Sequence, residues 1–232
     1  MIKAIIDGIN PDKYIYDTGL DFGVDVGHEL LEKAINHVEV FERRYNFYYP
    51  ESPAQLTRKI GAANAREAYR RIGQMKAAYT GGSIKLQQYA FPDDLAQQFL
   101  NTVPQWILDL SPGEPTPALQ ISCGGDYIGV HKGHKRQVSL FMLLQGQGQE
   151  TRWYRETEDF ALIDMLRIPD YDKIEHVVTA VMQPWRWYIF NNFEWHSVHN
   201  YSDGLRINVG FDFNNISTSD LLKAVQEQEV TA

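Results

Sequence analysis

Four of the seven histidines lie in two short clusters in the second half of the chain, and they carry the chemistry that the sequence suggests first. His131 and His134 form one cluster, and His196 and His199 form the other. Neutral imidazole nitrogens bind first-row transition metals. Each cluster lies at an end of a predicted strand, and strands distant in sequence can face each other across the mouth of a closed sheet. A single histidine fits a structural or surface position, but two such clusters favour a metal site.

Arg206 is the third residue with a chemical signal, because it lies inside the apolar segment 205–211. Alternation along a strand places Arg206 and Asn208 on one face and the neighbouring apolar residues on the other. A buried arginine needs an anionic partner, since an unpaired charge away from water is very costly. That partner is either an Asp or Glu of the chain or a ligand carboxylate bound by the guanidinium fork.

Composition limits the classes of protein to which the chain can belong. The 232 residues are 44% hydrophobic and 22% charged, with a net charge of −8. These values indicate a folded globular protein and argue against a broad basic surface for duplex nucleic acid. The single cysteine, Cys123, excludes a disulfide framework and a multi-cysteine zinc site. The opening residues lack a signal-peptide core, and no apolar run reaches the ~20 residues of a membrane span. We therefore expect a soluble, cytoplasmic protein with no membrane partner, and the oligomeric state stays open.

Helical patterns precede strand patterns along the chain. Helices are predicted for residues 26–35, 52–78 and 93–107 from apolar spacing, alanine content and capping residues. After a proline-rich loop, short runs of β-branched and aromatic residues bounded by Gly, Asn, Asp or Pro predict strands. These strands cover residues 118–123, 138–144, 177–182, 187–190 and 205–213.

The order of these elements predicts the architecture. Helices followed by consecutive short strands indicate an α+β protein whose helices pack on one face of an antiparallel barrel or sandwich. Residues 146–149 and 201–204 are rich in turn formers, and we expect them to form hairpin turns.

Residues from about 120 to 213 resemble the iron(II)- and 2-oxoglutarate-dependent oxygenases. The shared pattern is a histidine at a strand end, a second histidine, and an arginine about ten residues after the second one. Residues 187–198 resemble the strand and turn that carry the second histidine, and residues 150–154 resemble the strand after the first motif. Small members related to prolyl hydroxylases, frequent in bacteriophages, have similar sequences.

The resemblance implies a double-stranded β-helix (a jelly-roll, cupin-like barrel) with N-terminal helices packed on one sheet. We expect one domain, in which residues 1–117 form a mainly helical layer and residues 118–213 form the jelly-roll core. Residues 214–232 then form a tail or a helix. The implied activity is hydroxylation of an aliphatic C–H bond in a small-molecule or side-chain substrate, with Fe(II), 2-oxoglutarate and dioxygen. The sequence does not identify this substrate.

The resemblance also implies roles for individual residues. His131 and His196 would bind Fe(II). Arg206 would bind the far carboxylate of 2-oxoglutarate, with Asn208 in support. Tyr127 lies where a hydroxyl could donate a hydrogen bond to 2-oxoglutarate, although a tyrosine packed in the sheet is the simpler explanation.

One position departs from the family pattern, because Gly133 stands where the family usually has an Asp or Glu ligand. Three interpretations stay open. The protein is a two-histidine hydroxylase like the aspartyl/asparaginyl hydroxylases, an iron-dependent halogenase with chloride in the vacant position, or a non-catalytic jelly-roll protein with a degenerate site. Water, His134 or Asp126 could supply the missing ligand. His199 is an alternative to His196 as the second ligand, but we expect it to face solvent from a loop.

Overall fold

The computed structural model describes residues 1–36, 43–48, 85–90, 93–110, 117–122, 127–133, 137–159, 169, 171–200 and 204–229. Only the backbone is described for 43–48, 85–90, Asp93, Tyr127, Gly129, Tyr171 and Glu229. The helix predicted for residues 52–78 lies outside these residues, as do Cys123, Asp126 and His134. None of the described helices is both long and apolar enough to cross a lipid bilayer.

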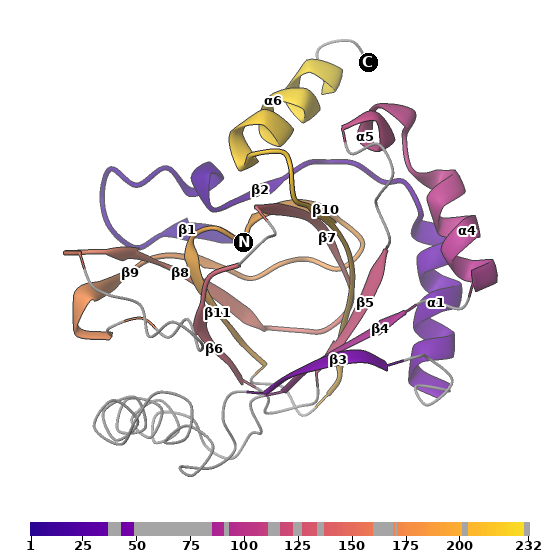
Figure 1. The fold of residues 1–232 in the computed structure, drawn as a ribbon, viewed down its shortest axis with the longest axis horizontal. Helices are drawn as coiled ribbons and strands as arrows, with labels where there is room; N and C mark the ends of the chain where they lie inside the picture. Colours follow the sequence, from indigo (N-terminus) through magenta and orange to yellow (C-terminus); the bar gives the residue numbers. More distant parts are fainter. Residues whose placement is uncertain are drawn as a thin grey trace.

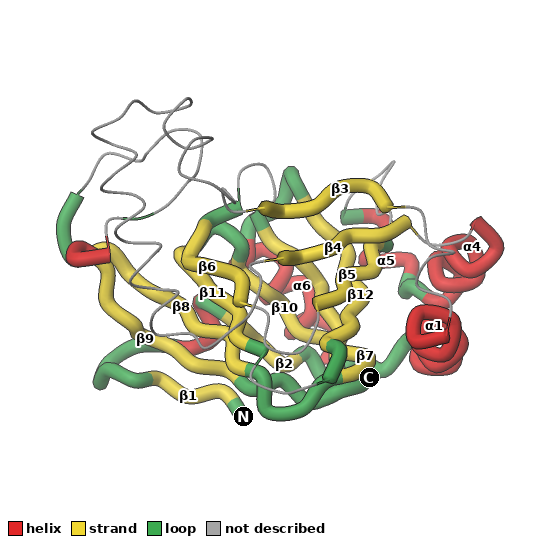
Figure 2. The backbone as a smooth tube through the Cα atoms, turned by 90° about the horizontal axis from the view of Figure 1, so that it is seen from below, coloured by secondary structure: helices red, strands yellow, loops and turns green. Residues whose placement is uncertain are grey.

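Two antiparallel sheets face each other in the described part of the chain (Figure 1 and Figure 2). The five-stranded sheet has the order β1 (Ile2–Ala4), β9 (Ile174–Ala180), β8 (Glu150–Glu156), β11 (Trp195–His199), β6 (Tyr127–His131). The seven-stranded sheet has the order β2 (Ile15–Asp17), β10 (Trp187–Asn191), β7 (Val138–Gln145), β12 (Arg206–Phe213), β5 (Ala118–Ser122), β4 (Lys85–Ala90), β3 (Arg43–Tyr48).

From β5 to β12, successive strands alternate between the two sheets, and only the β8–β9 connection stays within one sheet. This alternation winds the chain around a common lumen and defines a jelly roll, the double-stranded β-helix that the resemblance implied. The predicted fold class is therefore confirmed. The five predicted strands correspond to β5, β7, β9, β10 and β12.

The two turns predicted as hairpins are crossovers instead. Residues 146–149 join β7 of the seven-stranded sheet to β8 of the five-stranded sheet, and residues 201–204 lie between β11 and β12, which also belong to different sheets. Gly146 has a φ of 147° and Gly148 a φ of 67°, so the turn residues are suited to a sharp reversal. Because β7 is paired with β10 on one side and with β12 on the other, β8 cannot form a hairpin with β7. It pairs with β11 and β9 in the other sheet instead.

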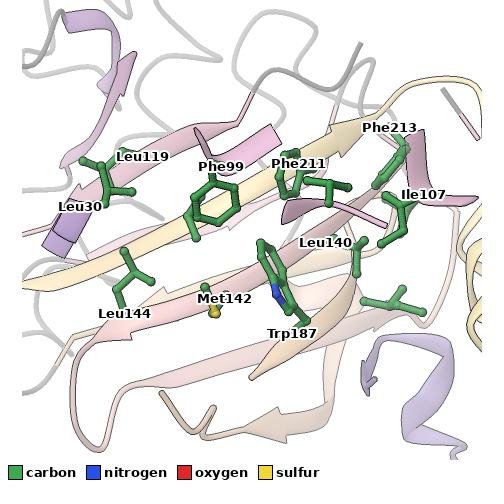
Figure 3. Packing of buried hydrophobic residues seen from close by; sticks show 14 of the residues in the cluster. Leu30, Phe99, Ile107, Leu119, Leu140, Met142, Leu144, Trp187, Phe211 and Phe213 are labelled. Carbon is green, nitrogen blue, oxygen red and sulfur yellow. The ribbon is translucent and has the colours of Figure 1, made fainter. Parts of the chain in front are cut away.

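In the part of the chain that the structure describes, four helices cover the outer face of the seven-stranded sheet (Figure 1). They are α1 (Val24–Asn36), α4 (Asp93–Thr102), α5 (Gln105–Asp109) and α6 (Thr218–Glu229), and the same residues include two single 3-10 turns, η1 (Pro11–Lys13) and η3 (Tyr171–Lys173). Helices packed on one sheet are what the sequence predicts. The helix predicted for residues 93–107 breaks at Pro104, which has no N–H to donate within a helix. Buried side chains from the helices and from β5, β7, β10 and β12 form the core in Figure 3.

The sheets begin earlier in the chain than the sequence predicts. Four strands, β1 to β4, precede residue 118 and extend the two sheets at their edges. Two of these strands have only three residues each, too few to produce a period-two signal. Residues 1–117 are therefore a mixed layer of helices and strands in their described part, and the end of the chain forms the helix α6.

The space between the two sheets holds a buried apolar cluster and, beside it, a small cavity. Phe141, Trp153, Val178 and Phe190 belong to a second buried cluster that draws on both sheets. β7 is buried on both faces, because its alternate residues contribute to the helix-covered core and to this inner cluster. The rest of the lumen holds a cavity lined by both polar and apolar side chains, and its polar residues form the candidate site.

Candidate metal and anion site

His131 and His196 lie side by side in the five-stranded sheet. His131 is the last residue of β6, His196 is in β11, and the two residues are direct partners in the antiparallel register. Their ring centroids are 4.2 Å apart, with planes inclined by 55°. Both residues line the same cavity in the lumen. The structure therefore brings together the two histidines that the sequence paired.

The His196 ring is held in one tautomer. Its Nδ1 lies 2.9 Å from the backbone oxygen of Glu194. A carbonyl oxygen only accepts, so Nδ1 carries the proton and Nε2 has the lone pair of a neutral imidazole. The edge of this ring also packs against Phe190, with centroids 4.9 Å apart. A histidine oriented through its other nitrogen in this way is typical of metal ligands.

Arg206 begins β12 and is buried, with 2% of its surface exposed. Its Nη1 donates to Oδ1 of Asn208 at 2.7 Å, and Nδ2 of Asn208 donates to Oε1 of Gln120 at 3.0 Å. Among the described residues, no Asp or Glu forms an ion pair with Arg206, and its Nε has no hydrogen-bond partner. The first alternative for Arg206, a carboxylate of the chain, is thus not found in the part of the chain that the structure describes.

Burial of the positive charge of Arg206 costs free energy. Burial lowers the pKa of its guanidinium to about 10, so the group is still a cation at neutral pH. The Phe141 ring lies 5.1 Å from Cζ and is a weak partner for a full charge. A buried cation with an unused N–H donor fits a small anion, and a carboxylate above all.

Ser122 is a neighbour of Arg206 that sequence reasoning missed, although it does not itself line the cavity. It is the direct partner of Arg206 across the β5–β12 pair, it is buried, and its hydroxyl has no hydrogen-bond partner. Two unused donors therefore lie on facing positions of adjacent strands. The only sequence signal was alternation within the predicted strand 118–123, and alternation does not reveal which residue stands opposite Arg206.

The cavity measures about 40 Å³, which is room for about three water molecules. A ligand group the size of a carboxylate fits such a space. Arg206 and the histidine pair share this cavity with a polar wall formed by Ser139, Asn192 and Asp212.

Gly133 has no side chain to act as the missing carboxylate ligand, and its backbone forms a hydrogen bond to the turn before His196. The N–H of Gly133 donates to the backbone oxygen of Asn192 at 2.6 Å. Among the residues that the structure describes, no group of three or more His, Cys, Asp or Glu side chains is arranged to hold a metal ion. The described donors are therefore two imidazoles. Two nitrogens suit a first-row divalent ion whose other positions are taken by water or by an oxygen ligand.

His199 does not belong to the cavity. It is the last residue of β11, three positions after His196, and alternation places it on the opposite face of the strand. Its Nε2 lies 2.9 Å from Oγ of Ser197, which also contacts the Tyr154 hydroxyl at 3.0 Å. Only 8% of His199 is exposed, so the expectation of a solvent-facing loop histidine is wrong. The alternation that places it outside the lumen also argues against it as a metal ligand.

We expect His199 to make folding stability depend on pH. Burial first, and then the charges of Arg152 and His176, lower its pKa from 6.5 to about 3. The unfolded chain then binds more protons than the folded one between these values, so stability falls as the pH drops from 6.5 toward 3. Denaturation at pH 7 and pH 5 should show a smaller loss of stability for His199→Gln than for the parent. An equal loss in both proteins would contradict this assignment.

Comparisons with known proteins add little to this geometry. No protein-family model matches the chain, and no curated protein matches it. Among solved structures, YcfD of Escherichia coli matches at 13% identity and a TM-score of 0.36, over 65% of this chain and 40% of that one. A second structure, described as Escherichia coli ribosomal oxygenase YcfD, matches at 11% and 0.33, over 61% of this chain and 35% of that one. A predicted oxalate decarboxylase from Thermotoga maritima matches at 12% and 0.30, over 59% and 86%.

The chain thus spans less than half the length of either YcfD chain. At these TM-scores we take the fold from the strand order of this chain. The cupin-like jelly roll rests on that order.

Proposed function

We propose that the chain is an iron(II)- and 2-oxoglutarate-dependent oxygenase that hydroxylates an aliphatic C–H bond of a small molecule or of a side chain. The observation that carries this proposal is a buried arginine with no carboxylate partner among the described residues, in the same cavity as a pair of histidines. A metal site alone would not require the arginine. An anion site alone would not require an oriented pair of imidazoles.

Two groups of residues in and around this cavity would have different roles, one in binding the metal and one in binding 2-oxoglutarate. His131 and His196 would hold iron(II) through ring nitrogens. Arg206 and Ser122 would donate hydrogen bonds to the far carboxylate of 2-oxoglutarate, because both have unused buried donors. Asn208 and Gln120 orient the guanidinium through their chain of hydrogen bonds. Phe141 lines the cavity beside Arg206, and Phe190 lines it beside His196. Their apolar rings would keep water out of that part of the cavity.

Iron(II), when bound, would supply the chemistry that couples the conversion of 2-oxoglutarate and dioxygen into succinate and carbon dioxide to the hydroxylation of a substrate C–H bond. The protein contributes position and a dry cavity. Gly133 adds no side chain, so the site would offer one more open position than a site with two histidines and a carboxylate. Tyr127 is placed in β6 by its backbone, and its role toward 2-oxoglutarate stays part of the proposal.

The test is turnover of 2-oxoglutarate by purified protein loaded with iron(II) without oxygen and then exposed to air. We expect succinate to form in an iron-dependent manner, even without the true substrate, and His196→Ala to abolish it. The same assay with chloride, and with mass analysis of any modified substrate, distinguishes hydroxylation from halogenation. Iron(II) binding without succinate formation, across candidate substrates, would favour a binding protein instead.

A further inference from the structure

We propose that Asn192 is a positioning residue that holds the two histidine-bearing segments at a fixed separation. This inference rests on the proposed function, because it concerns the metal site formed by His131 and His196. Asn192 lies in the turn between β10 and β11, four residues before His196, and only 3% of it is exposed. It touches neither ring in any described hydrogen bond, so its role is indirect.

The backbone of Asn192 joins three segments at this end of the barrel. Its carbonyl oxygen accepts from the N–H of Gly133, two residues after His131, at 2.6 Å. Its own N–H donates to the oxygen of Gln137 at 3.1 Å, and the N–H of Gln137 donates to the oxygen of Phe213 at 3.0 Å. The turn that leads to His196 is thereby tied to the strand end that carries His131.

The side chain of Asn192 connects the turn before β11 to Ser139 and Asp212, which line the cavity. Nδ2 donates to Oγ of Ser139 at 2.7 Å, and the Ser139 hydroxyl donates to the carboxylate of Asp212. Ser139 is 5% exposed, and all three residues line the cavity that contains the histidine pair. An amide that donates to a buried hydroxyl, itself oriented by a carboxylate, has few other positions available.

Loss of the hydrogen bond from Asn192 to Ser139 should lower the affinity for the metal more than it lowers the stability of the fold. Groups that orient metal ligands from outside the coordination sphere typically contribute about 10–100-fold to metal affinity. Without the amide, the turn can shift relative to Ser139, and the Gly133 bond transmits that shift to His131. Both histidines would remain present but at a less favourable separation.

Asn191, the last residue of β10 and the neighbour of Asn192, provides a matched control. Its Nδ2 donates to the oxygen of Lys13 at 2.9 Å, and its Oδ1 accepts from the N–H of Phe193 at 2.9 Å. Asn191 is also buried, with 8% exposed, but it does not line the cavity. Replacing it removes two side-chain hydrogen bonds, one more than replacing Asn192, without touching Ser139.

The experiment measures Co(II) binding without oxygen by the parent, Asn192→Ala, Ser139→Ala and Asn191→Ala, using calorimetry and the visible absorption of bound Co(II). Thermal unfolding of each metal-free protein reports on folding. We expect Asn192→Ala and Ser139→Ala to bind Co(II) about 10–100-fold more weakly, with an altered spectrum. Asn191→Ala should bind like the parent. Ser139→Ala keeps the test valid if Asn192→Ala does not fold, because it removes the acceptor of the amide, together with the hydrogen bond to Asp212, and leaves Asn192 in place.

The outcomes separate this inference from the function on which it rests. If the parent binds no Co(II), the proposed metal site is wrong and the role of Asn192 falls with it. If the parent binds Co(II) and both Asn192→Ala and Ser139→Ala bind it equally with an unchanged spectrum, only the positioning role is wrong. Equal weakening by Asn191→Ala would show that any damage to the turn suffices, and would also overturn the specific role of Asn192.

Discussion

Replacing Arg206 by lysine is expected to weaken 2-oxoglutarate binding by roughly 10-fold or more, since losing one hydrogen bond to a charged group costs about 1.5–3 kcal/mol. Lysine keeps the charge but not the planar fork of donors, and at a site for a carboxylate the exchange is not conservative. Co(II) binding should be unchanged, because His131 and His196 are untouched. Calorimetric titration of the metal-loaded protein with 2-oxoglutarate, without oxygen, measures the effect.

A second variant at this position tests why Arg206 is buried without a described carboxylate partner. Arg206→Met removes a desolvated charge from the lumen, and replacing a buried charge by an apolar side chain is often neutral or stabilising. We expect the ligand-free variant to unfold at the same temperature as the parent or higher, and 2-oxoglutarate to give it no stabilisation. A variant that is much less stable but still binds 2-oxoglutarate would show that Arg206 serves the fold.

The charge of the cavity can also be neutralised with Arg206 in place. Asn208→Asp puts a carboxylate oxygen where an amide oxygen now lies 2.7 Å from Nη1 of Arg206. An internal ion pair would then compete with the ligand, and 2-oxoglutarate binding should fall although both iron ligands and Arg206 are intact. Unchanged 2-oxoglutarate affinity in a folded Asn208→Asp protein would contradict the anion site.

Replacing either His131 or His196 by alanine is expected to weaken Co(II) binding by at least about 100-fold, beyond the range observed when only an orienting partner of a ligand is lost. The described residues offer two imidazoles and no third His, Cys, Asp or Glu in the same group. Losing one therefore removes half of the described protein donors. Calorimetry without oxygen measures this affinity.

His28→Ala is the matched control for the histidine variants. His28 is exposed and stacks on Trp185 with ring centroids 3.9 Å apart, outside the cavity. It should leave Co(II) binding unchanged. Equal Co(II) affinity in the parent, His131→Ala and His196→Ala would place any metal at another site and end the proposal for this cavity.

Much of this molecule can be predicted from local patterns in the sequence. The strand segments follow from short runs of β-branched and aromatic residues, and the positions of β5, β7, β9, β10 and β12 agree with them. Alternation along 205–213 places Arg206 and Asn208 on one face, and the structure has both in the lumen. These features depend only on the period of side chains along a strand, which is a local property.

Strand pairing is a different matter, because it depends on burial between segments far apart in the chain. The turn at residues 146–149 has the composition of a hairpin, yet it crosses between sheets since both edges of β7 are taken by β10 and β12. The short strands β1 and β2 form because they pair with β9 and β10. Each has only three residues, which is too short for an alternating pattern to reveal it in the sequence.

The candidate site also combines features that follow from local sequence patterns with features that depend on the tertiary structure. Residue type and spacing singled out the two histidine clusters and Arg206, and the family resemblance chose His131 and His196 within those clusters. Only the tertiary structure decided that Ser122 stands opposite Arg206, that Asn192 joins the two histidine segments, and that His199 is buried on the other face of β11. The physical reason is that a side chain's own strand sets the face on which it lies, whereas its partners are set by register and by the packing of two sheets.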